Sequence, residues 1–104
     1  MDKSTAVNNL MNNYGDMAGL DRLKLERLIE SGLSEGFSVR QIYNGIRLVL
    51  GMEYQQQEIF SASEAAEMLE VSESELFSRM AAIGAEPIKA KGEIYYFPNC
   101  VDMQ

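Results

Sequence analysis

The side chains that most often carry chemistry in proteins are scarce in this 104-residue chain. It contains no histidine, and Cys100 is its only cysteine. A zinc site of the usual kind is therefore excluded, and so is histidine-based acid–base or triad catalysis. The sequence also shows no paired carboxylates, phosphate-binding loop or nucleophile–base pair. We therefore expect no enzyme activity, no cofactor and no small-molecule ligand.

The chemistry that remains is that of charge, and the chain is acidic, with a net charge of −7. From Phe60 to Gln104 there are three basic and eight acidic residues, a net charge of −5, against −2 for the residues before them. DNA-binding domains normally carry a basic face. A negative surface that resembles phosphates would instead attract a basic protein. Five glutamates fall close enough together to form one: Glu64, Glu67, Glu70, Glu73 and Glu75.

The elements that must position these charges are two short helices joined by a tight turn. Ser61 with Glu64, and Ser72 with Glu75, have the spacing of capping boxes, in which the serine hydroxyl accepts a hydrogen bond from an amide of the first turn. The connection between the two helices is too short for an ordinary antiparallel bundle hairpin. The pattern therefore predicts a helix-turn-helix.

A small β-hairpin is predicted to follow the second helix. Gly84 is a C-cap candidate, and Pro87 prevents the helix from resuming. A turn at Lys91-Gly92 then separates two short apolar-rich runs, which is typical of a hairpin. Consecutive strand residues alternate between faces, so at least one ring among three neighbours should pack in the core: Tyr95, Tyr96 and Phe97.

Residues 61–98, a little over a third of the chain, resemble the excisionase-type and MerR-type DNA-binding domains. In that family a Ser/Thr-x-x-Glu-Ala-Ala-x-x-Leu opening precedes a Val-Ser turn, a second helix and a short wing. The matching residues are Ser61, Glu64, Ala65, Ala66, Leu69, Val71 and Ser72, with Leu76 and Met80 at apolar positions of the second helix and Ile94 to Pro98 as the return strand. The resemblance implies a winged helix-turn-helix.

The resemblance also implies which residues would contact DNA. In this family the second helix enters the major groove with its early residues facing the bases. The corresponding contacts here would be Ser74, Ser78 and Arg79 on the helix and Lys89 and Lys91 on the wing. The same early positions hold Glu73 and Glu75, which a phosphate backbone repels. About three phosphate contacts would give a monomer only weak, salt-sensitive binding, so this interpretation requires a homodimer.

The first half of the chain is predicted to contribute a pair of helices. Residues 1–19 are polar, and their few apolar residues at helical spacing are compatible with either a short helix or a frayed end. The run from Leu20 to Ser31 predicts a helix that stops at Gly32. One face of it would hold Leu20, Leu23, Leu28 and Ile29.

The second helix of the pair has the clearest pattern. Ser38 and Gln41 form a further capping box. An apolar stripe at the 3.6-residue period follows, made by Val39, Ile42, Tyr43, Ile46, Val49 and Leu50. The helix over Ser38–Leu50 is therefore the expected dimerisation surface.

We accordingly predict a mainly α fold in three parts. Residues 1–19 form the polar N-terminal segment, residues 20–59 the helical pair, and residues 60–104 the winged helix-turn-helix with its two-stranded hairpin. No apolar run reaches the roughly 20 residues that span a bilayer. The N-terminus lacks the apolar core of a secretory signal, so a cytoplasmic protein is expected.

Three functions follow from these observations. The first is a small DNA-binding regulator or excisionase-like accessory factor. The second is an acidic inhibitor of a nucleic-acid enzyme, of the anti-CRISPR or anti-restriction type made by phages and mobile elements, which binds the basic groove of its target protein. The third is a scaffold or oligomerisation module without a nucleic-acid role.

Overall fold

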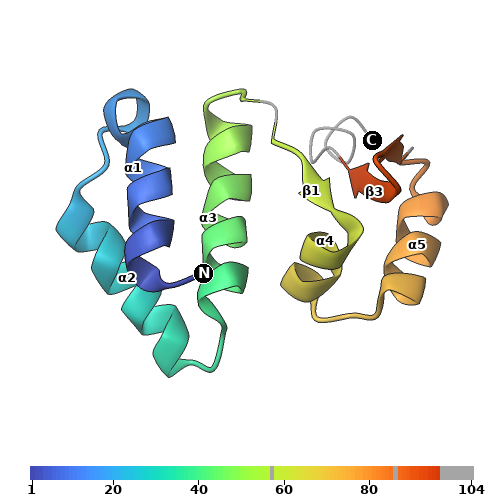
Figure 1. Ribbon diagram of the computed structural model, residues 1–104, viewed down its shortest axis with the longest axis horizontal. Coiled ribbons are helices and arrows are strands. Elements are labelled where there is room, and N and C mark those ends of the chain that lie inside the picture. Colours follow the sequence, from blue (N-terminus) through green and yellow to red (C-terminus); the bar gives the residue numbers. More distant parts are fainter. Residues whose placement is uncertain (57, 86, 97–104) are drawn as a thin grey trace. The chain divides into compact units, whose positions relative to one another are not determined.

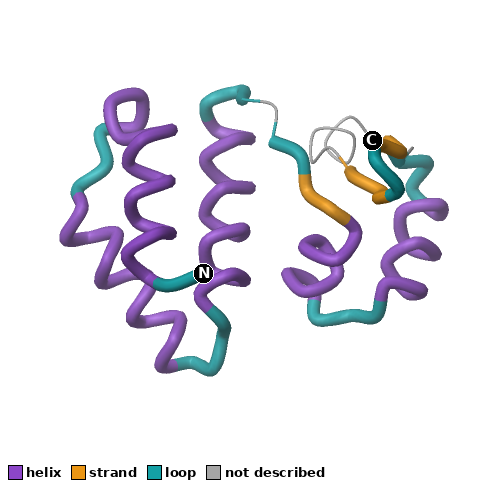
Figure 2. Tube along the Cα trace, viewed as in Figure 1, coloured by secondary structure: helices purple, strands orange, loops and turns teal. Residues whose placement is uncertain are grey.

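The computed structural model describes residues 1–56, 58–85 and 87–96, and this part of the chain is mainly helical (Figure 1). The chain divides into two compact units, Met1–Gln55 and Gln56–Gln104, called here the helical unit and the mixed unit. Every described strand belongs to the mixed unit (Figure 2). The predicted positions of Phe97, Pro98 and Cys100 lie outside the described residues. The prediction of a mainly α fold is confirmed.

The helical unit consists of three helices, each of which contacts the other two. They are α1 (Lys3–Ala18), α2 (Arg22–Ser34) and α3 (Val39–Glu53). The unit is therefore larger than the predicted helical pair, because residues 3–18 form a full helix rather than a frayed end. Asp2 caps this helix by accepting a hydrogen bond from the Thr5 amide at 2.8 Å, and Gly19 ends it in the left-handed conformation.

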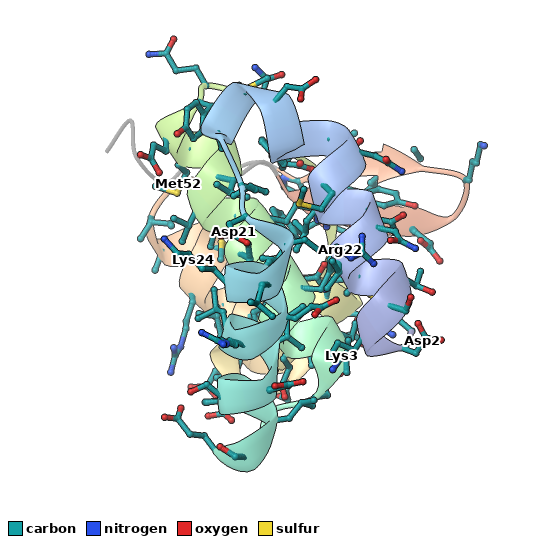
Figure 3. All side chains as sticks on the ribbon, turned by 90° about the vertical axis from the view of Figure 1, so that its left-hand side faces the viewer. Asp2, Lys3, Asp21, Arg22, Lys24 and Met52 are labelled. Carbon is teal, nitrogen blue, oxygen red and sulfur yellow. The ribbon has the colours of Figure 1, made fainter. Side chains whose placement is uncertain are left out.

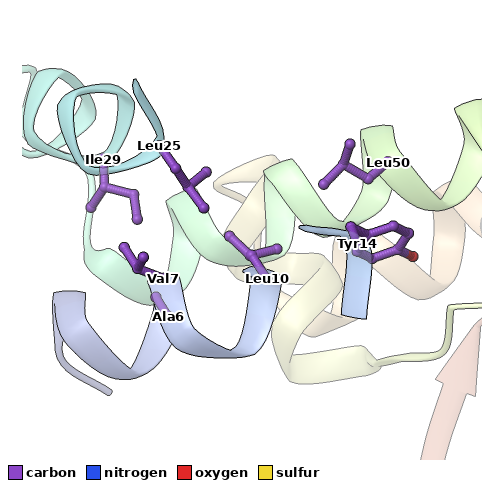
Figure 4. Packing of buried hydrophobic residues seen from close by; sticks show 7 residues of the cluster. All are labelled: Ala6, Val7, Leu10, Tyr14, Leu25, Ile29 and Leu50. Carbon is purple, nitrogen blue, oxygen red and sulfur yellow. The ribbon is translucent and has the colours of Figure 1, made fainter. Parts of the chain in front are cut away.

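Large apolar side chains from all three helices fill the core of the helical unit. Figure 4 shows this cluster, with four residues from α1, two from α2 and one from α3: Ala6, Val7, Leu10, Tyr14, Leu25, Ile29 and Leu50. The partly buried stripe of α3 packs against it through Val39, Ile42, Tyr43 and Ile46. The apolar stripe that was expected to dimerise is therefore largely used within one chain.

The apolar face predicted for the first helix of the pair is wrong in two positions. Leu23 and Leu28 are each 53% exposed, whereas Leu25 and Ile29, four residues apart, form the buried contact. Val49 of the predicted α3 stripe is likewise exposed. Spacing alone did not identify which stripe of α2 meets its neighbours, because leucines occur on several sides of this helix.

Gly32 does not end α2, contrary to the prediction. A Cβ atom built at this glycine would lie 2.6 Å from Cδ1 of Ile42, so the missing side chain allows α3 to approach closely. The helix continues to Ser34 and ends before Gly36, which has a φ of 98°. Asp21 caps the start of α2 by accepting from the Leu23 amide at 2.9 Å. Figure 3 shows Asp21 with Arg22 and Lys24 at this end of the helix.

The mixed unit combines two short helices with a small antiparallel sheet. The helices are α4 (Ala62–Leu69) and α5 (Glu73–Ala82), and the strands are β1 (Phe60–Ser61), β2 (Ile88–Ala90) and β3 (Glu93–Tyr96). The predicted β2–β3 hairpin is present. A third strand was not expected, because β1 has only two residues. It pairs with β3, which gives the order β1-β3-β2.

The core of the mixed unit is small. Leu76 of α5 is fully buried against three alanines of α4, Ala62, Ala65 and Ala66. Val71, Met80 and Ile94 pack around this cluster and are partly buried. The small alanines allow α5 and the sheet to approach α4 closely. Both α5 and the β2–β3 hairpin are therefore positioned by their packing against α4.

Candidate binding surface

The exposed side of α5 is positioned by its cap and by one buried residue. Ser72 accepts a hydrogen bond from the Glu75 amide at 3.1 Å, which fixes the first turn. Leu76 then anchors the helix in the core. Ser74 and Ser78, two of the predicted DNA contacts, are exposed and lie one helical turn apart. Both residues are therefore accessible to solvent.

The single basic residue of α5 is already engaged by an acidic one. Nη2 of Arg79 lies 2.9 Å from Oε1 of Glu75, one turn earlier on the same helix. Both side chains are about half exposed, so the pair is a surface salt bridge that contributes only a few tenths of a kcal/mol. A phosphate oxygen would have to compete with the Glu75 carboxylate for this guanidinium. A contact between Arg79 and a DNA phosphate would therefore be weaker than one made by an unpaired arginine.

The two predicted wing lysines have a different setting. Lys89 lies in β2, and its register partner on β3 is Ile94. Lys91 and Gly92 form the turn with φ values of 52° and 78°, as in a two-residue turn of the type I′ class. Both lysines are exposed, and neither makes an ion pair within the part of the chain that the structure describes.

The predicted acidic residues differ in what they do. Glu64 is half-buried, and its Oε1 accepts a hydrogen bond from the Ser61 amide at 2.9 Å, so it completes the predicted capping box. Glu67 is also half-buried. Glu70 is exposed and ends α4 in the left-handed conformation. Glu73 joins Glu70 and Glu75 as an exposed carboxylate, so the two α5 glutamates and Glu70 form the accessible acidic surface.

A cleft of about 260 Å³ opens between the start of α4, the first turns of α5 and the hairpin. The α5 side of this cleft carries Glu73 and the ring of Phe77. The hairpin side carries Glu93 and Ile94, beside Gly92 of the turn. The third side, at the junction of β1 and α4, consists of two serines and an alanine: Ser61, Ala62 and Ser63. Residues of different elements thus line one concave site, and two of them, Glu73 and Glu93, are acidic.

Glu93 is the residue of this cleft that the sequence analysis missed. The signal for it was weak, since only strand pairing brings a residue after the hairpin turn next to α5. The hydroxyl of Tyr95 donates a hydrogen bond to Oε2 of Glu93 at 2.8 Å. This hydrogen bond raises the pKa of Tyr95, and desolvation and the Glu93 and Glu64 charges act in the same direction. Tyr95 therefore keeps its proton and holds the Glu93 carboxylate in place.

No known protein family, curated protein or solved structure shows significant similarity to this chain. Over the described residues, no helix is long and apolar enough to cross a membrane. The same residues contain no group of three or more cysteine or acidic side chains arranged to hold a metal ion.

Proposed function

We propose that the mixed unit is a winged helix-turn-helix used as an acidic protein-binding module, and that its partner is a basic, nucleic-acid-binding protein. One observation carries the proposal. The helix that would read DNA bases presents Glu73 and Glu75, and its one cation, Arg79, is paired with Glu75. A phosphate backbone placed against this helix would meet net negative charge. A basic protein groove would meet complementary charge.

Inhibition of a nucleic-acid enzyme is the function that best suits such a surface. The net charge of −7 favours association with a positively charged groove and disfavours association with nucleic acid. By occupying the groove, the protein would exclude the nucleic acid that normally binds there. This proposal needs neither a cofactor nor catalytic residues in this chain.

The test compares two variants of equal net charge. We measure binding of an arginine- and lysine-rich dodecapeptide to the wild type, to Glu73→Lys/Glu75→Lys and to Glu35→Lys/Glu53→Lys, whose substitutions lie in the helical unit. In the first variant, two attractive surface charges are replaced by two repulsive ones. Its affinity for the peptide should therefore fall roughly tenfold. The second variant should lose less than about twofold, because its sites lie outside the acidic surface. Equal losses in both variants would reject the proposal.

Reversal of Glu75 also removes the partner of Arg79 and a favourable charge at the start of α5. The single variant Glu73→Lys leaves that pair intact, and circular dichroism establishes that each variant is folded. If the double variant is unfolded, its loss of binding is not informative. The binding of the folded single variant Glu73→Lys then decides whether the proposal holds.

DNA binding through the hairpin is the second candidate, and the exposed lysines favour it. Lys89 and Lys91 have no ion-pair partner among the described residues. Two phosphate contacts predict that affinity for a mixed-sequence duplex falls about tenfold between 50 and 200 mM salt. Such binding, abolished in Lys89→Glu/Lys91→Glu, would establish this function. An absence of binding at 50 mM salt would exclude it.

The homodimer that DNA binding requires would need a surface other than the apolar stripe of α3. Val39, Ile42, Ile46 and Leu50 of that stripe pack against the core of their own unit. Sedimentation velocity at several protein concentrations tests for a dimer directly. A monomer throughout would favour the protein-binding proposal, since a single acidic surface can act without self-association.

A further inference from the structure

The cleft of the mixed unit has the size and lining of a site for one side chain. Its volume of about 260 Å³ lies below the range of about 300–1,000 Å³ that is typical of small-molecule sites. Its walls come from three elements that the small core holds together, α4, α5 and the hairpin. An occupant would therefore contact all three elements.

The charge inside the cleft is negative. Glu73 makes no hydrogen bond or ion pair with any described residue through its side chain, so its carboxylate is available to a ligand. Glu93 accepts from Tyr95 through Oε2, which leaves Oε1 for a second donor. Among the described residues, those that line the cleft include no lysine or arginine. The occupant should therefore be a cation with more than one hydrogen-bond donor.

The Phe77 ring in the lining of the cleft indicates which basic side chain, arginine or lysine, fits better. Phe77 is 37% exposed, whereas the other large apolar residues of α5 pack in the core: Leu76 is fully buried and Met80 is partly buried. A guanidinium is planar, is weakly hydrated and stacks on aromatic faces, whereas an ammonium group is compact and strongly hydrated. A guanidinium also presents a fork of donors to carboxylates. A cleft lined by Phe77 and two acidic residues thus favours arginine over lysine.

We infer that this cleft receives an arginine side chain of the basic partner, with its guanidinium between the Glu73 and Glu93 carboxylates and against the Phe77 ring. This inference rests on the proposed protein-binding function and identifies the group that the surface recognises. Phe77 provides the selectivity between the two basic side chains, and the two carboxylates provide the charge.

The first experiment uses a probe that does not depend on the identity of the partner. The ¹⁵N-labelled full chain is titrated with N-acetyl-arginine amide, N-acetyl-lysine amide and N-acetyl-citrulline amide. Arginine should shift amide signals around the cleft, at Glu73, Phe77, Gly92 and Ile94. Citrulline has nearly the same shape without the charge and should shift none of them. Equal responses to arginine and citrulline, or shifts spread over both units, would overturn the inference.

The second experiment measures the dodecapeptide affinity of cleft variants. Phe77→Leu keeps an apolar residue but removes the ring, and it should weaken binding roughly two- to fivefold. Glu93→Gln keeps the size but removes the charge, with a similar expected loss. Glu35→Gln, an exposed site at the end of α2, is the matched control and should change the affinity less than about twofold.

The two proposals fail in different ways. If Glu73→Lys/Glu75→Lys abolishes peptide binding while Phe77→Leu and Glu93→Gln bind like the wild type, the acidic surface binds protein but the cleft does not take arginine. If no peptide binds to the wild type, the protein-binding function is rejected, and the titration with arginine amide still tests the cleft independently.

Discussion

The two units of this chain are held together in different ways. The helical unit has helices of 16, 13 and 15 residues, and the three supply leucine, isoleucine, valine and tyrosine side chains to its core. The mixed unit has helices of only 8 and 10 residues, and its described core holds two large buried side chains, Phe60 and Leu76, with alanines as the remaining buried residues. Side-chain burial is thus distributed in the first unit and concentrated in the second, where caps and turns must contribute a larger share of the stability.

The largest effect that tests this comparison is expected from Leu76→Ala. Leu76 is fully buried, and its truncation removes apolar contacts and leaves a cavity, which costs about 2–5 kcal/mol. A core with so few large side chains should not tolerate this loss, so amide signals of the mixed unit should collapse towards random-coil values in an NMR spectrum. Leu10→Ala in the helical unit is the matched variant, because Leu10 is only 1% exposed. If the mixed unit remains folded in Leu76→Ala, its stability is less concentrated than its core suggests.

A smaller effect is expected where helices of the helical unit meet. Gly32→Ala places a Cβ 2.6 Å from Cδ1 and 2.8 Å from Cγ1 of Ile42, so either the Ile42 side chain or the helix backbones must shift. We expect a net loss of about 1–2 kcal/mol in the free energy of unfolding, measured by urea denaturation. Gly45→Ala is the control on α3, where the added methyl group meets nothing within 4 Å, and it should stabilise by about 0.5–1 kcal/mol. Equal effects at the two glycines would show that the close packing of α2 on α3 does not determine the stability of the helical unit.

Loss of an N-cap should cost about 1 kcal/mol in either unit, but it should affect the two helices over different lengths. Ser61 and Glu64 form a reciprocal capping box at the start of the eight-residue α4, and Ser38 and Gln41 form one at the start of the 15-residue α3. Ser61→Ala and Ser38→Ala should each cost about 0.5–2 kcal/mol. Hydrogen exchange should accelerate throughout α4 but only in the first turn of α3, since the longer helix is held by its core contacts. Exchange confined to the first turn in both helices would contradict the comparison.

The smallest effect concerns a surface contact between α1 and α2. Nζ of Lys3 lies 2.6 Å from Oε1 of Glu30. The hydrogen bond between them raises the pKa of Lys3 above 10.5 and lowers that of Glu30 below 4.5. The stability that Glu30 contributes is present above pH 4.5 and is lost as the pH falls through its lower folded pKa. The Lys3 contribution is lost only as the pH rises above 10.5 through its folded pKa.

The test of this pair is the difference in Tm between the wild type and Glu30→Gln across the acidic range. The difference should be small at pH 7 and should vanish at a pH well below 4, where the wild-type carboxylate is also neutral. Glu35→Gln, which removes an exposed charge at the end of the same helix, is the control. A difference that grows on acidification would mean that Glu30 acts through something other than its charge.

Much of the local structure was predictable because its causes are local. The capping boxes at Ser38 and Ser61 involve residues three positions apart, and both are present. The box predicted at Ser72 forms only in part, because the Glu75 carboxylate accepts a hydrogen bond from Arg79 and not from the Ser72 amide. The hairpin turn at Lys91-Gly92 was predicted from the glycine, and both residues adopt positive φ. The mainly helical character and the amphipathic α3 also followed from periodicity. Predictions failed where a residue's role depends on a distant neighbour.

The predicted acidic set shows the same limit at the candidate site. Sequence proximity grouped Glu64 with Glu73, yet Glu64 serves the cap of α4 while Glu73 lines the cleft. Glu93 was left out because twenty residues separate it from Glu73 in the chain. Strand pairing and the alanine-lined contact of α4 bring the two residues to the lining of one concave site. The winged helix-turn-helix itself stays a prediction, as does its partner.

The sequence by itself determined the helix starts, the turns, the excess of negative charge and the absence of histidine, since each is a property of residue types or of neighbours within one turn. Only the tertiary structure decided that Leu25 rather than Leu23 is buried, that Gly32 marks a close helix contact, and that Glu73 and Glu93 face one cleft. Those outcomes depend on which surfaces exclude water together, and that is settled by packing between elements.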